Sequence, residues 1–326
     1  MLMLLKLNRM FSRIICMKIM ITGGMGFVGS HLCDRLVANN EVIVITKSNS
    51  KNQNLKQILS KITIDYLDIT DYKLLEKSIL KYKPEIIVHL AGQTSHSQSF
   101  IDPLYDIDVN AKSTLCILET LRKNNIQCKF ILGSTFIVIG KPLSLPVDEN
   151  TPCNPTTIYG TNRLASENYC KIYHDVYGLD TIVFRITNSF GPREQFETTK
   201  NAINHLIYKA FRGKEITIYN QGKFFRDLIY ISDVISGIET IMLKGKSGHL
   251  YWISSNRKTW FDELGKILHK HTNAPIKYID PPQYTKTVDV GNFIVDNSKL
   301  NSLGWSVKTS VENGILQTLE YFRTMI

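Results

Sequence analysis

The chain has 326 residues, 43% of them hydrophobic and 21% charged, so it is long enough to bury one large core or two smaller ones. Its formal charge of +10 comes mostly from lysines, which are scattered and form no basic stripe with aromatic residues, so we do not expect it to bind nucleic acid. No stretch approaches the roughly 18 apolar residues that a membrane span needs, so a membrane protein is not expected either.

The six cysteines indicate a reducing environment. They form no CxxC pair and no Cys/His spacing typical of a metal site. Several lie in apolar runs, where a free thiol behaves as a small hydrophobic side chain. Because disulfide frameworks belong to oxidising compartments, this pattern favours the cytoplasm, and we expect no bound metal.

Residues 1–17 come directly before the first predicted strand, which begins at residue 18. Their longest uncharged apolar run is too short for a signal peptide, and no small-residue cleavage site follows it. We expect them to be a dispensable extension.

Short β-branched runs alternate with helical patterns through the first half of the chain. Continuous apolar runs of this kind are typical of parallel strands that helices cover on both faces. The sequence therefore predicts an α/β fold with a doubly wound parallel Rossmann sheet over residues 18–187. A smaller C-terminal substrate-binding lobe is predicted over residues 188–326, from which residues 226–240 return to the first domain. The predicted strands are 18–21, 41–45, 62–66, 86–90, 129–132 and 181–185.

A glycine-rich segment, Thr22–Gly29, joins the first predicted strand to a helical pattern. In that setting Gly23 permits a sharp turn, Gly26 leaves room for a pyrophosphate, and Gly29 lets the helix approach the strand. The helix N-terminus then offers free N–H groups and a positive dipole end to the anion. Taken alone, the pattern also fits a structural turn. Read as a dinucleotide site, it includes Gly23, Gly26, Phe27, Val28 and Gly29.

The residues after the second predicted strand bear on the choice of dinucleotide. An acidic side chain at this point would bind the ribose diol of NAD, whereas this chain has Thr46 and Lys47. A carboxylate would repel a 2′-phosphate, but a hydroxyl and an ammonium group would accept one. We therefore expect NAD or NADP, with these two residues favouring NADP unless they belong to an ordinary polar loop.

Two further strand ends supply candidate cofactor contacts. Asp68 and Ile69 follow the third predicted strand, where they would bind the edge of the adenine. Leu90, Ala91 and Gly92 lie where the chain leaves the fourth, and this stretch is small enough for the backbone to run along the cofactor. Both segments lie at carboxyl ends of strands, where the ligands of such sheets bind.

Tyr159 opens a helical pattern in which Arg163 follows one turn later. Residues four apart lie on one helix face, so the two side chains point the same way. Tyrosine titrates near a pH of about 10, and a neighbouring cation lowers that pKa, which yields an acid/base group usable near neutral pH. Upstream, Ser134 and Thr135 end the fifth predicted strand and place a hydroxyl for the same substrate oxygen. Taken alone, the Tyr–Arg spacing also fits a plain amphipathic helix.

Several motifs of this chain occur in the order and at the spacing that they have in a known enzyme family, which the chain therefore resembles. Together they are similar to the extended short-chain dehydrogenases/reductases, in the NAD-dependent epimerase/dehydratase group that acts on nucleotide sugars. The resemblance runs from about Met17 to at least Val234. The motifs that carry it are the glycine turn, Asp68, 89–92, 134–135, Tyr159, 185–193 and 226–234.

The resemblance implies a transient hydride transfer at a sugar carbon. Tyr159 would take the hydroxyl proton while the nicotinamide takes the hydride. Thr135 would assist the oxygen, and Arg163 would bind the nicotinamide ribose and tune the tyrosine.

The resemblance also implies a nucleotide-diphosphate sugar as substrate. Asn188 and Arg226 would hold its diphosphate, the arginine through a charge-assisted pair of hydrogen bonds. Ile218 and Tyr219 would lie against the nucleotide base. For Arg226 the alternative is a structural ion pair with Asp227 or another carboxylate.

The chain departs from the family pattern at two places, and both departures bear on which reaction it catalyses. The family usually has lysine at Arg163, whose guanidinium keeps the positive charge but cannot give up a proton. Dehydratases of the family have an acidic pair after the strand-end hydroxyl, whereas Phe136 and Ile137 follow Thr135 here. The sequence thus predicts a nucleotide-sugar epimerase acting at C4. The alternatives are an NADPH-dependent 4-keto-sugar reductase, favoured by the residues after the second strand, and a non-catalytic dinucleotide-binding protein, suggested by Arg163.

Two further expectations concern the loop after the fourth strand and the assembly. His96 lies in that loop, where it either faces the substrate or belongs to the surface. By resemblance we expect a homodimer that pairs through helices over residues 108–121 and 159–177.

Overall fold

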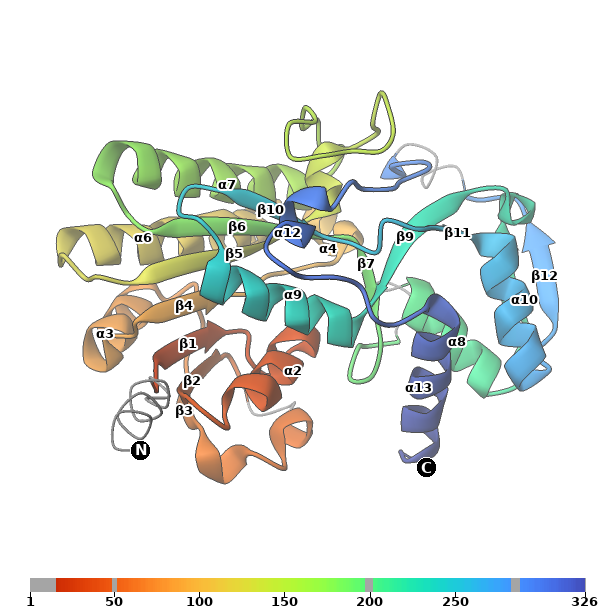
Figure 1. The fold of residues 1–326 in the computed structure, drawn as a ribbon, viewed down its shortest axis with the longest axis horizontal. Coiled ribbons are helices and arrows are strands. Elements are labelled where there is room, and N and C mark those ends of the chain that lie inside the picture. The colour runs from red at the N-terminus through yellow and green to blue at the C-terminus, as the bar shows by residue number, and fades with distance from the viewer. Residues whose placement is uncertain (1–15, 49–51, 197–201, 283–287, 326) are drawn as a thin grey trace, which may run out of the picture.

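A computed structural model describes residues 16–48, 52–196, 202–282 and 288–325. Its centre is a seven-stranded parallel sheet in the order β10-β6-β5-β4-β1-β2-β3 (Figure 1). The predicted doubly wound α/β fold with a smaller second lobe is therefore confirmed. The strands of the sheet are β1 (Lys18–Thr22), β2 (Glu41–Thr46), β3 (Thr63–Tyr66), β4 (Ile86–His89), β5 (Lys129–Thr135), β6 (Thr181–Ile186) and β10 (Leu250–Ile253).

The sheet reverses its winding direction between β1 and β4. β1 pairs in parallel with both β2 and β4, and the chain adds β3 on one side and β5 and β6 on the other. Ligands of such sheets bind at the carboxyl ends of the strands beside this reversal. The glycine turn after β1 and the loop after β4 both leave the sheet at that point, so the topology itself brings them together.

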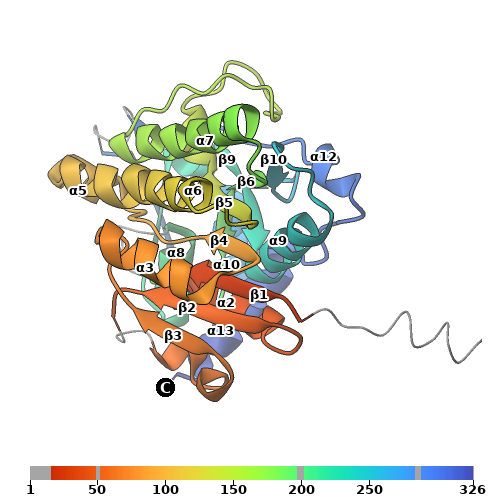
Figure 2. The same ribbon diagram turned by 90° about the vertical axis from the view of Figure 1, so that its left-hand side faces the viewer.

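Helices cover both faces of the sheet (Figure 2). On one face α3 packs on α6 and α6 on α7, over a core that includes Met20. On the other face α2 packs on α9, over a core that includes Ile19 and Ile21. Alternate residues of β1 therefore enter opposite cores, as the period of two in a strand requires. The helices are α2 (Phe27–Leu36), α3 (Tyr72–Tyr82), α4 (His96–Ile101), α5 (Pro103–Ile107), α6 (Ser113–Lys123), α7 (Ile158–Tyr177) and α9 (Ile231–Lys244).

The smaller lobe lies at the right-hand end of the molecule in Figure 1. It holds a three-stranded sheet in the order β11-β9-β7 and a two-stranded sheet of β12 and β8. Between α8 and α13, the Phe196 ring stacks on Tyr208 at 4.0 Å, and both rings meet Phe322 edge-on. The elements are β7 (Asn188–Phe190), α8 (Ala202–Phe211), β8 (Ile216–Tyr219), β9 (Phe225–Tyr230), β11 (Lys258–Trp260), α10 (Phe261–Thr272), β12 (Ile276–Ile279) and α13 (Val311–Arg323), whereas α12 (Ser298–Asn301) packs on β10 of the central sheet.

The six predicted strands are all present, with ends that differ from the predicted ones by at most three residues. The seventh strand, β10, is missing from the prediction, although it pairs in parallel with β6 and buries Tyr251 and Trp252. The predicted extension at residues 1–17 lies outside the described residues, apart from Cys16 and Met17. In the part of the chain that the structure describes, no helix is both long and apolar enough to cross a membrane.

The core around α6 offers a test of how the sheet is stabilised. Leu118 on α6 is fully buried, whereas Leu243 on α9 is 63% exposed. We expect Leu118→Ala to lower the free energy of unfolding by about 2–5 kcal/mol, because it removes buried methyl groups and leaves a cavity. Leu243→Ala should change it by less than about 0.5 kcal/mol. Urea unfolding of both variants measures the difference, and similar losses in the two would contradict this packing.

Candidate active site

The glycine turn leads from β1 into α2 and leaves the start of the helix open. Gly26 is the residue before the helix, and among the described residues no side chain caps it. Gly23 has a φ of 71°, which favours glycine, and a Cβ there would lie 2.9 Å from the Ala91 backbone. A Cβ at Gly29 would lie 2.3 Å from the Gly23 carbonyl oxygen. The turn therefore demands these glycines, and it presents the first N–H groups of α2, beginning at Phe27 and Val28, as a helix N-terminus does to a phosphate.

Two buried polar atoms beside the loop after β4 fit a bound dinucleotide. A Cβ at Gly92 would lie 2.7 Å from Asn110 Oδ1 and 3.5 Å from Arg163 Nη1, so the loop passes closely over both side chains. Asn110 Oδ1 and Arg163 Nε are buried, and neither has a hydrogen-bond partner among the described residues. An unpaired buried polar atom costs about 1–3 kcal/mol, so both atoms are suited to the hydroxyls of a ribose. The residues present thus fit the predicted cofactor.

A buried hydrogen-bond chain through His89 holds the same loop. Thr22 Oγ1 lies 2.7 Å from His89 Nδ1, and Ser113 Oγ lies 3.3 Å from His89 Nε2. Ser113 donates to the Val109 carbonyl and the Ala91 N–H donates to Thr22 Oγ1, so His89 donates through Nε2 and accepts through Nδ1. Burial and the nearby Arg163 charge lower the pKa of His89 to about 3, which keeps the ring neutral.

Lys47, predicted to attract a 2′-phosphate, is already paired. Its Nζ lies 2.7 Å from Asp68 Oδ2, and the Thr70 N–H and hydroxyl donate to the other oxygen of the same carboxylate at 3.0 and 2.9 Å. Partial burial alone would raise the pKa of Asp68, but Lys47 and Thr70 together lower it. The ammonium charge is therefore largely balanced, which weakens the predicted preference for NADP.

The neighbouring predicted contacts differ in how far their side chains are accessible. The Thr46 hydroxyl donates to the Ser48 carbonyl at 3.3 Å, so it is not pointing freely at a ligand. Ile69 is buried in the core, so it can offer an adenine only its backbone. Leu90 and Ala91 are half-buried and line the loop beside the glycine turn.

Tyr159, Thr135 and Arg163 lie together where β5 ends and α7 begins. Tyr159 is 7% exposed and Arg163 is 4% exposed. Burial raises the pKa of Tyr159, and the nearby Arg163 charge and Thr135 hydroxyl offset this rise only in part. A phenol in such a place ionises only with a fixed positive charge nearby. The three residues thus place a phenol, a hydroxyl and a fixed positive charge close together, as an acid/base group of this kind requires.

One turn beyond Arg163 on α7, Glu167 forms a buried ion pair with Arg185 of β6. The Arg185 Nε and Nη2 atoms reach the two carboxylate oxygens at 3.0 and 2.6 Å. Glu167 also accepts a hydrogen bond from Ser134, the neighbour of Thr135. The pair ties α7 to the ends of β5 and β6. Glu167 is not among the predicted site residues, although its spacing of four from Arg163 places both side chains on one helix face.

On the substrate side, the predicted contacts are only partly accessible. Asn188 begins β7, and its buried Nδ2 has no hydrogen-bond partner within the described residues, which suits a group that meets a ligand. Ile218 is 1% exposed and packs against α10, so it can offer a base only its backbone. Tyr219 is half-buried at the end of β8.

Arg226 has a carboxylate partner, and this partner is Asp289 rather than Asp227. Its guanidinium donates to Asp289 and to the Gly291 carbonyl, and it lies 5.3 Å from the centre of the Phe224 ring. Asp227 accepts instead from three backbone N–H groups, those of residues 255, 256 and 295. A substrate diphosphate would therefore share Arg226 with Asp289 or displace it.

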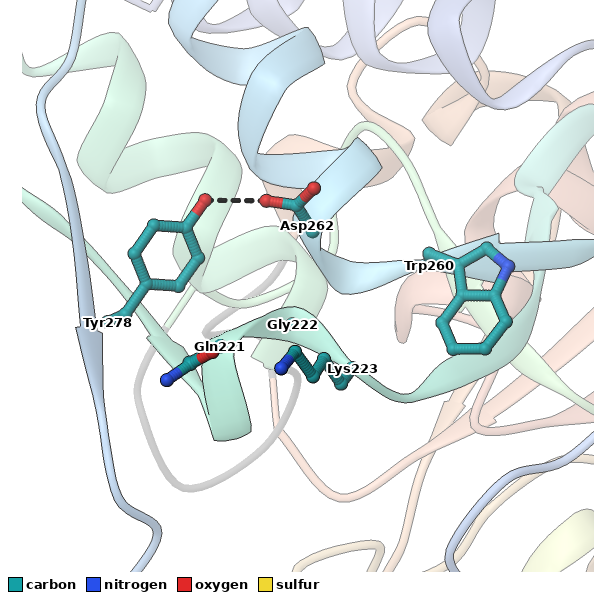
Figure 3. Close-up of a pocket in the computed structure, with 6 residues that line it drawn as sticks. All are labelled: Gln221, Gly222, Lys223, Trp260, Asp262 and Tyr278. Atoms are coloured by element: carbon teal, nitrogen blue, oxygen red, sulfur yellow. Dashed lines mark hydrogen bonds between the residues drawn. The ribbon is translucent and has the colours of Figure 1, made fainter.

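A cavity of about 570 Å³ lies in the smaller lobe, between the turn after β8 and the start of α10 (Figure 3). Trp260 and Lys223 border it, and the Tyr278 hydroxyl donates to Asp262 at 2.6 Å. None of the predicted catalytic residues lines this cavity. It is therefore not the candidate reaction centre, which lies at the carboxyl ends of β1, β4 and β5.

The match to a known family agrees with this site. The NAD dependent epimerase/dehydratase family matches residues 19–254, a span that runs from β1 to the end of β10. The chain belongs to this family. The predicted resemblance and the prediction of an enzyme are thereby confirmed, whereas the roles of individual residues stay predictions.

Relatives cover nearly the whole chain. A Methanocaldococcus jannaschii protein provisionally named a UDP-glucose 4-epimerase is 32% identical over 94% of this chain and 98% of its own length. The crystal structure of Thermotoga maritima UDP-glucose 4-epimerase with UDP-glucose is 32% identical, with a TM-score of 0.87 over 95% of this chain and 99% of that one. Human dTDP-D-glucose 4,6-dehydratase is 28% identical over 94% of this chain and 90% of its own. The family therefore contains proteins named as epimerases and proteins named as dehydratases.

The pairing of Lys47 with Asp68 gives a prediction about cofactor choice. Asp68→Asn removes the charge that balances Lys47, so the ratio of NADP to NAD affinity should rise several-fold. Dissociation constants for both dinucleotides, measured by calorimetry on cofactor-stripped protein, test this. Adding Lys47→Ala to Asp68→Asn should cancel the gain, and a gain that persists in the double variant would show that Lys47 is not its source.

Proposed function

We propose that this enzyme is an NAD-dependent UDP-sugar 4-epimerase. The observation that carries the proposal is the buried Tyr159, which lies beside the Thr135 hydroxyl and the positive charge of Arg163. UDP is proposed because it is the nucleotide in the names of the Methanocaldococcus and Thermotoga proteins. C4 is the carbon at which those relatives are named to act.

Tyr159 performs the proton chemistry of the proposed reaction. As a phenolate it accepts the proton of the sugar 4-hydroxyl while hydride leaves C4, and Thr135 donates a hydrogen bond to the same oxygen. Bound NAD supplies the hydride acceptor and donor. The 4-keto sugar turns its other face to the cofactor before Tyr159 returns the proton, so neither proton nor hydride is gained or lost. Arg163 serves as a fixed positive charge that favours the phenolate.

The residues after Thr135 favour epimerisation over dehydration. Loss of water from the sugar needs a group that protonates the departing hydroxyl. Phe136 packs edge-on against Phe293 at 5.2 Å, and Ile137 is buried in the core. Neither side chain can donate a proton, so the acidic pair of the family's dehydratases has no counterpart at these two positions.

Cofactor recognition favours NAD and therefore the epimerase over the reductase. The reductase alternative was favoured by Thr46 and Lys47, but the Lys47 ammonium group is paired with Asp68 and the Thr46 hydroxyl donates to the Ser48 carbonyl. The buried atoms Asn110 Oδ1 and Arg163 Nε would hold the dinucleotide beside the glycine turn. A tightly held cofactor suits an epimerase, which recycles its dinucleotide in place.

The proposed assembly is a cytoplasmic homodimer that pairs through α6 and α7. Ile172 and Val176 lie one turn apart on α7 and are 49% and 65% exposed. Exposed apolar side chains on one helix face are suited to a partner helix. The six free cysteines are typical of a reducing compartment.

The first test identifies the cofactor and the reaction in one preparation. The purified protein is denatured, any released dinucleotide is identified by mass spectrometry, and conversion of UDP-glucose to UDP-galactose is assayed without added cofactor. About one NAD per chain and interconversion of the two sugars are expected. NADPH consumption without epimerisation would indicate the reductase. Bound NAD without turnover of any nucleotide sugar would indicate the non-catalytic protein.

Tyr159→Phe should lower kcat by about 10²- to 10⁴-fold, because it removes the proton acceptor while keeping the ring. NAD content, measured by absorbance after denaturation, should be unchanged. A variant that keeps NAD and retains most of its turnover would refute the role of Tyr159.

Arg163 should set the pH dependence of the reaction. The active form of Tyr159 is the phenolate, so kcat/KM should rise with pH through an apparent pKa. Since Arg163 lowers the pKa of Tyr159, Arg163→Met should raise it and move this limb to higher pH. Arg163→Lys keeps the charge and should leave the limb close to that of the wild type. A pH–rate profile of the three proteins measures the shift, and an unmoved limb in Arg163→Met would contradict this role.

A further inference from the structure

His96 is the first residue of α4, and hydrogen bonds fix it relative to the helix that carries the predicted catalytic tyrosine. The Gln93 amide donates to the Ser95 carbonyl at 2.7 Å and to Asp106 at 3.0 Å. Asp106 is fully buried, and its other oxygen accepts a hydrogen bond from Asn162 of α7 at 2.7 Å. The backbone that presents His96 is thereby joined to α7.

The His96 imidazole meets the Tyr159 ring edge to face. The ring centres are 5.5 Å apart and the planes cross at 86°. Tyr159 is buried whereas His96 is half-buried, so the imidazole lies nearer to solvent than the phenol does. Thr135, Arg163 and Asp106 are polar side chains that also act on the phenol. His96 therefore borders the place that a substrate oxygen must occupy.

The His96 ring differs from the other histidines in its lack of a partner. Six of the chain's eight histidines have a ring nitrogen within hydrogen-bond distance of another residue. Among the described residues, neither nitrogen of His96 has such a bond. The remaining histidine, His249, is exposed, so water satisfies its ring. A partly desolvated ring without a protein partner is suited to a polar ligand.

The protonation state of His96 matches a sugar hydroxyl. Burial lowers the pKa of His96, and the Asp106 charge opposes this only in part. The ring faces Tyr159 of α7, and Asp106 is the charged group that acts on it among the described residues. A neutral imidazole has one donor and one acceptor nitrogen, and a hydroxyl likewise donates and accepts.

Building on the proposed function, we propose that His96 is a sugar-binding residue of the reaction centre, whose imidazole hydrogen-bonds a hydroxyl of the UDP-linked hexose held over Tyr159. Its contact is with the sugar and not with the nucleotide or the dinucleotide.

The test separates sugar binding from nucleotide binding. His96→Phe keeps an aromatic ring against Tyr159 but removes both nitrogens, and His96→Leu removes the ring as well. With the NAD-loaded enzyme, we expect each variant to bind UDP within twofold of the wild type, while its affinity for UDP-glucose and its kcat/KM fall about tenfold. His249→Phe is the matched control at an exposed histidine and should change neither quantity.

The outcomes distinguish this inference from the proposed function. Equal losses for UDP and UDP-glucose, or no loss for either, would overturn the inference and leave His96 a packing residue. If His96→Phe loses its bound NAD, the affinities for UDP and UDP-glucose are compared in His96→Leu instead, and that comparison decides whether His96 binds the sugar. Failure of the wild type to epimerise UDP-glucose would refute the proposed function, whereas the ratio of UDP-glucose to UDP affinity would still report on His96.

Discussion

The buried ion pair between Glu167 and Arg185 is the constraint on which the geometry of the candidate site depends. Both side chains are almost completely removed from water, and such charges are tolerated only when they are paired and hydrogen-bonded. Glu167 also accepts from Ser134, so one carboxylate joins α7 to β5 and β6. Because α7 also carries Tyr159, and Thr135 follows Ser134, the same bonds that satisfy Glu167 bring the two predicted catalytic groups together.

Burial of Tyr159 and ionisation of its phenol oppose each other. Excluding water from the tyrosine protects the reacting centre but raises the pKa of the phenol, so an adjacent positive charge is required. Arg163 meets that requirement without being able to lose its own proton. His89, which also lies near Arg163, is neutral because burial and that charge lower its pKa. Arg163 therefore supplies a fixed positive charge while the His89 ring stays neutral, so the positive potential beside Tyr159 comes from Arg163.

The cofactor side and the substrate side of the site are prepared differently. On the cofactor side, Asn110 Oδ1 and Arg163 Nε are buried without partners among the described residues, so a ligand supplies what the protein lacks. On the proposed substrate side, Arg226 already has Asp289 as a partner, so a diphosphate bound there would compete with a carboxylate. Unpaired buried atoms favour tight retention of a cofactor, whereas an ion pair whose arginine can change partners suits a substrate that binds and leaves in each turnover.

Features encoded over a few neighbouring residues were predictable from the sequence alone. The parallel strands, the glycine turn around Gly26 and the Tyr159–Arg163 spacing are such features, because a strand's apolar run, a tight turn and a helix face each depend on local backbone geometry. Partners far apart in the chain were decided only by the tertiary structure. The sequence did not reveal that Lys47 would be neutralised by Asp68, or that β10 would close the sheet, since both follow from packing of distant segments. The sequence by itself determined the fold class and the chemistry available at the strand ends. The tertiary structure decided which charges are balanced and that the His96 ring lies against the Tyr159 ring, because burial and proximity arise only when the segments pack together.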